Sequence, residues 1–407
     1  MGPLKGIKVV DVSRVLAGPW ATQALADFGA TVYKIEKPGT GDDTRGWGPP
    51  WLKAPDGSDT AESAYFLSTN RGKQSIAIDL ATPDGQRIVK ALAANADVFV
   101  ENFKVGGMKR YGLGYEDLKA QNPRLVYCSI SAFGQDGPAA AGAGYDAMIQ
   151  GMGGLMSLTG LPDGTPGAGP QKVGVAVADL TTGMYAIAAI VAALFERTTS
   201  GQGQYIDLAL LDTQVAWLAN QNMNYLVTGK VPRRHGSAHP NIVPYQAFET
   251  KDGHLMLAVG NDGQFARFAE LAGNAGLARD PAYATNAGRV RNRAVLVPII
   301  EELLKRDITA AWLSKLAPAA VPCGPINDVA AVFEEPQVRH REMRLDLPHP
   351  LSGTVPQVRS PIRYSRTALE YSRPPPLLGE HTSAVLGAEL GLGPEELAKL
   401  KAAGVIG

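Results

Sequence analysis

One carboxylate in the sequence stands where it could act as a nucleophile. Asp179 lies in the segment Val175-Ala-Val-Ala-Asp179-Leu-Thr-Thr-Gly183, between an apolar strand-like run and an apolar helix. Burial in such a place raises the pKa of a carboxyl group, whereas the positive end of a helix lowers it. A poorly solvated carboxylate can be a nucleophile, but an aspartate before a helix is most often an N-cap. Position alone leaves both interpretations open.

A set of basic residues lies near the strand ends and helix starts that the sequence predicts in its first third. Open α/β sheets bind their ligands in this region. Taken singly, each basic side chain is most often a solvated surface charge. Taken together, they could hold a small ligand that carries phosphate groups. The residues are Lys37, Arg45, Arg71, Lys73, Lys104, Lys109 and Arg110.

The two cysteines do not form a reactive pattern. Cys128 lies within an apolar strand, and Cys323 lies in a Pro-Cys-Gly-Pro turn with no adjacent histidine to lower its pKa. We expect structural roles for both. Because the chain has no CxxC pair, it also fits a reducing compartment, and we predict a cytoplasmic location.

Metal and dinucleotide sites are not predicted. His235 and His239 have the i, i+4 spacing that serves a metal on a helix, but Gly236 and Pro240 disfavour a helix there. The first strand–helix turn lacks the GxGxxG pattern that lets a backbone approach a pyrophosphate. Glu36 ends a strand where a ribose-binding acid would stand, and we interpret it as a solvated glutamate.

Charge and hydropathy exclude further classes of partner. The chain has 407 residues with 39 Lys and Arg against 39 Asp and Glu, and no run of basic residues. We therefore expect neither nucleic acid nor an anionic membrane surface as a partner. The most apolar stretch, Met184 to Phe195, is shorter than a membrane span and is predicted to be a buried core helix.

The elements that must position these residues follow an alternating strand and helix order. This order predicts an α/β fold with a Rossmann-like, mostly parallel sheet and helices on both faces. Strands are expected at residues 7–12, 31–36, 75–80, 97–100 and 125–131, and helices at 18–28 and 83–94.

Two domains are predicted from changes in composition along the chain. Residues 1–225 form a large α/β domain, which the C-terminal segment 331–407 completes. Residues 226–330 form a smaller α+β domain with flanking linkers. The glycine-rich stretch 139–174 is too long for an ordinary connection, so a functional loop is expected there.

With these residues in view, the chain resembles the family III CoA-transferases. This group includes formyl-CoA transferase, carnitine and bile-acid CoA-transferases, and α-methylacyl-CoA racemase. The resemblance runs from end to end and rests on motifs in order. They are Leu16-Ala-Gly-Pro19, Val32-Tyr-Lys-Ile-Glu36 with Gly41-Asp42, Asn70-Arg-Gly-Lys73, Val100-Glu-Asn-Phe103, Tyr111-Gly-Leu113, Asp179-Leu-Thr-Thr-Gly183, Gly201-Gln-Gly-Gln204, Val321-Pro-Cys-Gly-Pro325 and Leu377-Leu-Gly-Glu-His-Thr382.

The resemblance implies that Asp179 is the catalytic nucleophile. Its carboxylate would attack a CoA thioester and form a covalent aspartyl intermediate, from which CoA passes to a free carboxylic acid. This outweighs the N-cap interpretation. The thioester is the substrate, and no tightly bound cofactor is expected.

The same matching implies the residues that bind CoA. Val15, Leu16, Lys37, Asn102, Phe103 and Arg110 would line the CoA site, with the basic side chains on phosphates. Tyr145 would lie near the thioester. Arg71 and Lys73 join this set through the basic cluster described above.

The resemblance also bears on the substrate, the alternative activity and the assembly. Formyl-CoA transferase has a glutamine at the position of Leu16, so formate and oxalate are not expected, and the run His239 to Phe248 looks more like the succinyl-CoA-dependent dicarboxylate transferases. The alternative is a racemase-type isomerase, but the loop Gly144-Tyr145-Asp146 lacks the histidine that racemases have there. The family forms interlocked homodimers, which the resemblance implies here.

Overall fold

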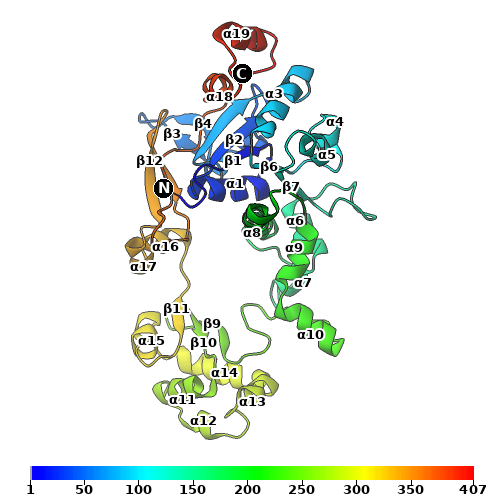
Figure 1. Cartoon of the computed structure of the whole chain (residues 1–407). Coiled ribbons are helices and arrows are strands. Elements are labelled where there is room, and N and C mark those ends of the chain that lie inside the picture. Colours follow the sequence, from blue (N-terminus) through cyan, green and yellow to red (C-terminus); the bar gives the residue numbers. More distant parts are fainter. Residues whose placement is uncertain (1) are drawn as a thin grey trace. The chain divides into compact units, whose positions relative to one another are not determined.

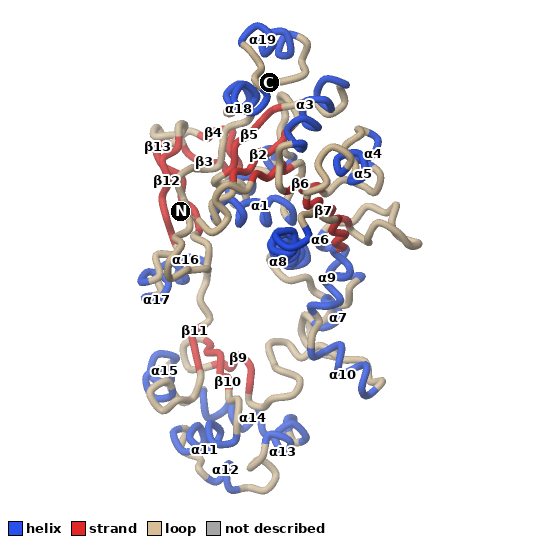
Figure 2. The backbone as a smooth tube through the Cα atoms, viewed as in Figure 1, coloured by secondary structure: helices blue, strands red, loops and turns tan. Residues whose placement is uncertain are grey.

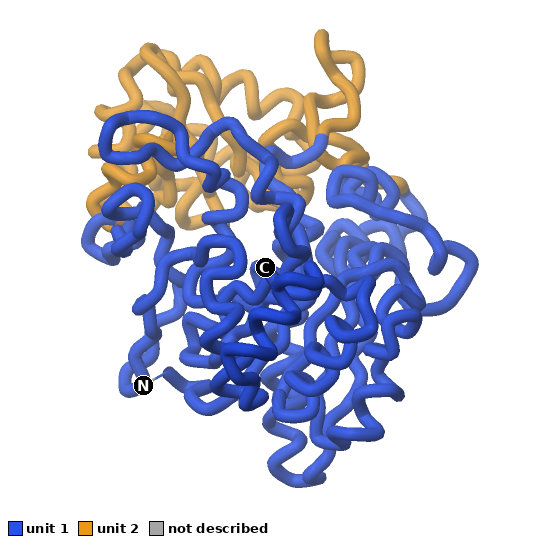
Figure 3. The backbone as a smooth tube through the Cα atoms, turned by 90° about the horizontal axis from the view of Figure 1, so that it is seen from above, with its two compact units in different colours: residues 1–155, 172–230, 339–407 blue, residues 156–171, 231–338 orange. Residues whose placement is uncertain are grey.

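The computed structural model describes residues 2–407, which divide into two compact units (Figure 3). The first unit comprises residues 1–155, 172–230 and 339–407, and the second comprises 156–171 and 231–338. Sequence analysis did not separate residues 156–171, which are part of the glycine-rich stretch and belong to the second unit.

A parallel sheet forms the centre of the first unit, as predicted (Figures 1 and 2). Its strand order is β5-β2-β1-β6-β7-β8, and every neighbouring pair is parallel. The chain starts near the middle of the sheet with β1. It adds β2 and β5 on one side and then β6, β7 and β8 on the other. The strands are β1 (Lys8–Asp11), β2 (Thr31–Glu36), β5 (Lys73–Ala77), β6 (Val98–Glu101), β7 (Val126–Ser131) and β8 (Tyr205–Ala209).

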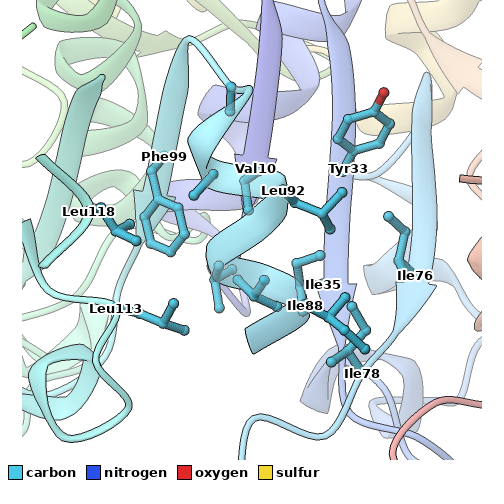
Figure 4. Close-up of a cluster of buried hydrophobic side chains, with 14 of the residues drawn as sticks. Val10, Tyr33, Ile35, Ile76, Ile78, Ile88, Leu92, Phe99, Leu113 and Leu118 are labelled. Carbon is cyan, nitrogen blue, oxygen red and sulfur yellow. The ribbon is translucent and has the colours of Figure 1, made fainter. Parts of the chain in front are cut away.

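Helices cover both faces of this sheet, so residues of its strands are buried on both sides. Val10 of β1 packs into one core with α3 (Pro83–Ala94), α18 (Thr382–Leu390) and α19 (Pro394–Ala402). Figure 4 shows this core around Ile88 and Leu92 of α3. Val9, one residue earlier, packs into the opposite core with α1 (Ala17–Asp27) and α8 (Val177–Ser200).

The other elements of the first unit surround this sandwich or extend its loops. They are η1 (Asp43–Gly46), β3 (Trp51–Lys53), β4 (Asp59–Ser63), α2 (Ala64–Leu67), α4 (Gly107–Arg110), α5 (Tyr115–Lys119), α6 (Asp146–Met152), α9 (Leu210–Trp217), α10 (Asn220–Thr228), β12 (Arg344–His349) and β13 (Gly353–Val358). Where the chain crosses between the units it forms α7 (Leu155–Leu158) and α17 (Pro336–His340).

The second unit has an antiparallel sheet with strand order β11-β10-β9 and its own apolar core. The buried Arg289 guanidinium connects three segments of this unit. It donates to the Val243 and Tyr283 carbonyls and to Asp262. The elements are β9 (Tyr245–Glu249), β10 (His254–Ala258), β11 (Cys323–Pro325), α11 (Asp262–Leu271), α12 (Gly276–Arg279), α13 (Asn286–Arg291), α14 (Arg293–Leu304), α15 (Thr309–Leu316) and α16 (Val329–Glu334).

The most apolar stretch, which was predicted to be a buried core helix, lies in helix α8 and is only partly buried. The helix has 24 residues, and among residues 2–407 it is the one helix that is long and apolar enough to cross a membrane by length and composition. Ala186 and Ile190 are buried against the sheet, but Met184 and Phe195 are 62% and 77% exposed. The stretch is therefore a core helix on one face only, and its other face is an exposed apolar surface.

Candidate active site

The candidate site is a pocket at the carboxyl ends of β1, β6 and β7, with a volume of about 190 Å³. Because parallel strands end at one edge, the loops after them meet there. The pocket is lined by residues 14–17, 102–105, 130–132, 140 and 142–145, with Asp43, Asp179 and Leu210.

Asp179 enters this pocket from the first turn of α8. The helix begins at Val177, so Asp179 is its third residue and the N-cap is Ala176. The N-cap interpretation of Asp179 is therefore wrong for a geometric reason. Burial, together with the smaller effect of the negative charge of Asp146, raises the pKa of Asp179 to about 7.

Asp146 performs the capping that sequence analysis considered for Asp179. Its carboxylate accepts the N–H groups of Ala178 at 2.8 Å and of Asp179 at 3.2 Å, and Gln150 donates to it at 2.6 Å. This buried group therefore stabilises the start of α8 and places a negative charge beside Asp179. Sequence analysis missed this role, although Gln150 follows Asp146 at the i, i+4 spacing of a helical pair.

Close packing of α8 against α1 places Asp179 beside the loop that follows β1. A Cβ atom at Gly183, one turn after Asp179, would lie 2.7 Å from the Ala17 carbonyl oxygen. Real Cβ atoms do not approach a backbone oxygen so closely, so this position requires glycine. The glycine of the Asp179-to-Gly183 motif thus brings the carboxylate to the wall formed by Val15 and Leu16.

The opposite wall is joined to this loop by the side chain of the residue that directly follows β6. Asn102 accepts the Arg14 N–H at 2.8 Å and donates to the Arg14 carbonyl at 2.7 Å. The Arg14 guanidinium lies 4.9 Å from the centre of the Phe103 ring. Asn102 therefore holds the two strand-end loops at a fixed separation, with Phe103 between them and the solvent.

The structure brings together most of the predicted CoA residues. Lys37 and Arg110 are exposed, outside the set of residues that line the pocket. Tyr145 is 70% exposed at the pocket's outer edge. The residues that line the pocket with Asp179 are Val15, Leu16, Asn102, Phe103 and Tyr145.

Lys73 and Arg71 do not line the pocket, and the geometry opposes the phosphate contacts predicted for them. The Lys73 ammonium is fully buried and donates to Asp11 at 3.0 Å and to Asn70 at 2.9 Å. Burial lowers its pKa to about 8. Arg71 is also buried and donates to both carboxylate oxygens of Asp27, at 2.9 and 2.6 Å. Neither cation can bind a ligand without breaking its ion pair with the aspartate.

Glu36 and Arg45 require a similar correction. The Glu36 carboxylate is not solvated but buried, and it accepts two hydrogen bonds from Arg45, both at 2.8 Å. The Arg45 guanidinium also lies 3.6 Å from the centre of the Phe66 ring. This pair stabilises the segment after β2 instead of binding a ligand.

No sequence motif pointed to two aromatic residues, Tyr65 and Trp47, as part of the surroundings of Asp179. Burial raises the pKa of Tyr65 to about 12, and the negative charges of Asp179, Asp146 and Asp42 act in the same direction. The Trp47 ring meets the Tyr65 ring edge to face at 5.1 Å. Tyr65 belongs to the one-turn helix α2, which has no motif of its own.

Neither the cysteines nor the histidines are among the residues that line this pocket. Cys128 is completely buried in β7, and burial raises the pKa of its thiol to about 12. Cys323 lies in β11 of the second unit, where burial also raises its thiol pKa. Within residues 2–407, no group of three or more His, Cys, Asp or Glu side chains is arranged to hold a metal ion.

Comparison with known proteins agrees with the chemistry of the pocket. The model of the family described as CoA-transferase family III matches residues 4–382. The chain is 53% identical to the succinate–glutarate CoA-transferase of Agrobacterium fabrum, over 95% of this chain and 96% of that protein. It is 45% identical to the succinyl-CoA:glutarate CoA-transferase of Mus musculus, over 100% of this chain and 91% of that protein.

A solved structure is similar over the same length. The crystal structure of a CAIB/BAIF family protein from Brucella suis is 50% identical, with a TM-score of 0.83. The match covers 95% of this chain and 99% of that one.

Replacing Asp146 with asparagine should lower the pKa of Asp179. Asp146→Asn keeps an oxygen for the capped N–H groups but removes the negative charge that opposes ionisation of Asp179. Titration of Asp179 can be followed by carbon NMR of protein with labelled aspartate carboxyls, using Asp179→Asn for assignment. The midpoint should lie near pH 7 in the unaltered protein and at lower pH in the variant.

The exposed Asp84 provides the control, because Asp84→Asn removes an equal charge from a residue that does not line the pocket and should leave the midpoint unchanged. An unchanged or raised midpoint in Asp146→Asn would show that Asp146 does not set the ionisation of Asp179.

Proposed function

The chain belongs to CoA-transferase family III, and from that membership we propose that it moves CoA from a dicarboxyl-CoA thioester, such as succinyl-CoA, to a second dicarboxylic acid. The observation that carries the proposal is the carboxylate of Asp179 inside a pocket with apolar walls at the sheet edge. The printed names of the relatives from Agrobacterium and mouse, which refer to succinate and glutarate, support the substrate class.

The proposed reaction exchanges one activated carboxyl group for another through Asp179. A carboxylate oxygen of Asp179 attacks the thioester carbonyl, CoA leaves as a thiolate, and a mixed anhydride forms. The acceptor carboxylate then attacks the aspartyl carbonyl of the anhydride, and the donor acid leaves. Finally the thiolate attacks the acyl carbon of the acceptor, which forms the new thioester and regenerates the Asp179 carboxylate. No separate energy source is required.

The environment of Asp179 suits this attack. Val15, Leu16 and Ile130 line the pocket and restrict the water around the carboxylate, which makes an ionised oxygen more reactive. Because its pKa is raised to about 7, the reactive ionised fraction grows as the pH rises through neutrality. Covalent transfer should therefore become faster from pH 6 to pH 8.

The size of the pocket indicates which part of the substrate it takes. A volume of about 190 Å³ is far too small for a whole CoA thioester, so we assign the acyl and thioester end to it. The exposed cations Lys37, Lys104 and Arg110 would then bind the phosphates outside, with Phe103 against the pantetheine or adenine. No tightly bound cofactor is part of this proposal.

The structure offers nothing that favours the isomerase alternative. The pocket loop reads Gly144-Tyr145-Asp146, and no histidine occurs between residues 1 and 234. An α-proton at the substrate would therefore have no imidazole base among the residues that line the pocket.

We also propose that the active protein is a homodimer, interlocked as the family resemblance implies, in the reducing cytoplasm. Its support is the exposed apolar face of α8 and α10, in which Phe195, Leu226 and Val227 are 77%, 70% and 75% exposed. Apolar surface of this kind is typical of an interface. We assign it to a second copy of the chain instead of a membrane, and both cysteines are unpaired as a reducing compartment requires.

A screen of donors and acceptors tests the substrate class. With succinyl-CoA as donor, glutarate should be converted at least about tenfold faster than pentanoate, its monocarboxylic analogue of equal length. The CoA products are identified by mass spectrometry. If formyl-CoA with oxalate proved the best pair, the interpretation of Leu16 would be wrong, and rapid α-proton exchange of a 2-methylacyl-CoA in deuterated water would favour the isomerase.

Asp179 should be indispensable and should carry the acyl group. Asp179→Asn and Asp179→Ala should fold and lose at least about a thousandfold in transfer rate, because covalent catalysis is removed. Incubation of the unaltered protein with succinyl-CoA and hydroxylamine should convert this side chain to the hydroxamate, as peptide mass spectrometry would show. Asp84→Ala is the matched control, and labelling of any other carboxylate would refute the assignment.

Chain exchange tests the interlocked dimer. Linked rings cannot separate without unfolding, so dilution should not yield folded monomers. Tagged and untagged protein, mixed in native buffer and examined by native mass spectrometry, should form mixed dimers only after denaturation and refolding. Mixed dimers within minutes, or a folded monomer at low concentration, would contradict the proposal.

A further inference from the structure

Val15, on the wall of the pocket, has a backbone conformation that its side chain opposes. Its φ is +70°, in the left-handed region that branched residues rarely adopt. Such a conformation persists only when the surrounding structure enforces it. Because Val15 and Leu16 form the wall that faces Asp179, whatever holds this residue also shapes the site.

A buried ion pair holds the loop at Val15 and at Ser13, two residues before it. The Asp42 carboxylate accepts the Val15 N–H at 3.2 and 3.3 Å, one distance to each oxygen. The Lys34 ammonium donates to Asp42 at 2.9 Å and to the Ser13 carbonyl at 3.1 Å. The pair therefore binds one backbone donor and one backbone acceptor of the same loop.

The pair is rigid because it is buried and fully engaged. Lys34 is 0% and Asp42 is 2% exposed. The second anchor of Asp42 is η1, where it accepts the Thr44 N–H at 3.0 Å and the Thr44 hydroxyl at 2.8 Å. Burial alone would raise the pKa of Asp42, but Lys34 and Thr44 hold it well below its usual range, so the carboxylate is charged. Two buried charges are stable only while each has its partner.

We propose that Lys34 and Asp42 are positioning residues that hold Val15 in its left-handed conformation and so keep the Val15–Leu16 wall in place for the CoA thioester. The proposal rests on the proposed function for the identity of the ligand. Neither residue lines the pocket. Without the pair, Val15 is expected to relax to a negative φ, which moves its side chain and that of Leu16.

The direct test replaces both charges together with apolar side chains of similar size. Lys34→Met with Asp42→Leu avoids leaving an unpaired buried charge, so the protein should fold, as circular dichroism would show. The dissociation constant for CoA, measured by calorimetry, should rise by about tenfold or more, because a misplaced wall weakens a preorganised site. The rate of transfer at saturating substrate should also fall.

An ion pair at the other edge of the sheet is the control, with the Arg197 side chain buried and the Asp97 side chain 27% exposed. Arg197 donates to Asp97 at 2.8 Å, and Asp97 directly precedes β6, at the opposite end from the pocket. Arg197→Met with Asp97→Leu should leave the dissociation constant for CoA within about twofold of the unaltered protein. An equal loss in this control would show that a buried pair matters only for general stability, and would overturn the proposal.

A glycine at position 15 separates positioning from structural damage. Glycine adopts a positive φ without strain, so it needs no clamp. In the unaltered protein Val15→Gly should weaken CoA binding, because the wall loses a side chain. In the Lys34→Met, Asp42→Leu background the same substitution should strengthen binding, because the strain that drives relaxation is removed. A loss of equal size in both backgrounds would contradict the proposal.

Two further outcomes decide between this inference and the proposed function. If the double variant does not fold, Asp42→Asn takes its place, since it retains an acceptor for the Val15 N–H and should show a smaller loss of affinity with the same rescue by glycine. A folded variant that binds CoA as the unaltered protein does would overturn the clamp while transfer by the unaltered protein still stood. Unaltered protein that binds CoA but transfers it to no acid would overturn the proposed function alone.

Discussion

The site depends on a conflict at Asp179, because a carboxylate proposed as a nucleophile must be poorly solvated to react quickly and yet ionised to react at all. Burial and the negative charge of Asp146 both oppose ionisation, and they hold the pKa near 7. The first turn of α8 opposes this shift through its backbone dipoles, but Asp146 already accepts two of the N–H groups there. The local electrostatics therefore lower the ionised fraction of Asp179 near neutral pH. Small changes around Asp146 should alter this fraction.

Positioning follows from features that are ordinary in an α/β fold. The parallel strands bring their carboxyl ends to one edge, and the loops after β1 and β6 become the two walls of the pocket. The walls are fixed by side chains that bond to backbone, since Asn102 binds both polar groups of Arg14 and Asp42 binds Val15. Gly183 then allows α8 to approach closely enough to bring Asp179 into the pocket. Each contact joins elements that lie far apart in the sequence.

Such contacts explain what the sequence could and could not predict. Local periodicity was sufficient for five of the six strands of the parallel sheet but not for β8, and the motif around Asp179 was sufficient to select a carboxylate that the structure places in the pocket. Lys73 and Glu36 were misread because sequence shows that a charge ends or begins a strand but not that it points inward. The partner of Lys73, Asp11, lies 62 residues away. Asp146 and Tyr65 were missed for the same reason, since their importance depends on distances to Asp179 that no spacing rule contains.

The inward-pointing charges also explain how rigid walls can surround a reactive group. Apolar packing alone would place the sheet, but it would not fix the conformation of loops whose backbone groups point toward the pocket. Buried ion pairs can do so, because each charged side chain offers several bonds and loses its stabilising interactions entirely when displaced. The cations that were predicted to bind phosphate thus fall into a buried group and an exposed group. Those beneath the strand ends, such as Lys73, hold the scaffold, and exposed ones such as Arg110 remain available to a charged substrate. A charged side chain can bind the ligand only where it is not already paired with another charge inside the fold.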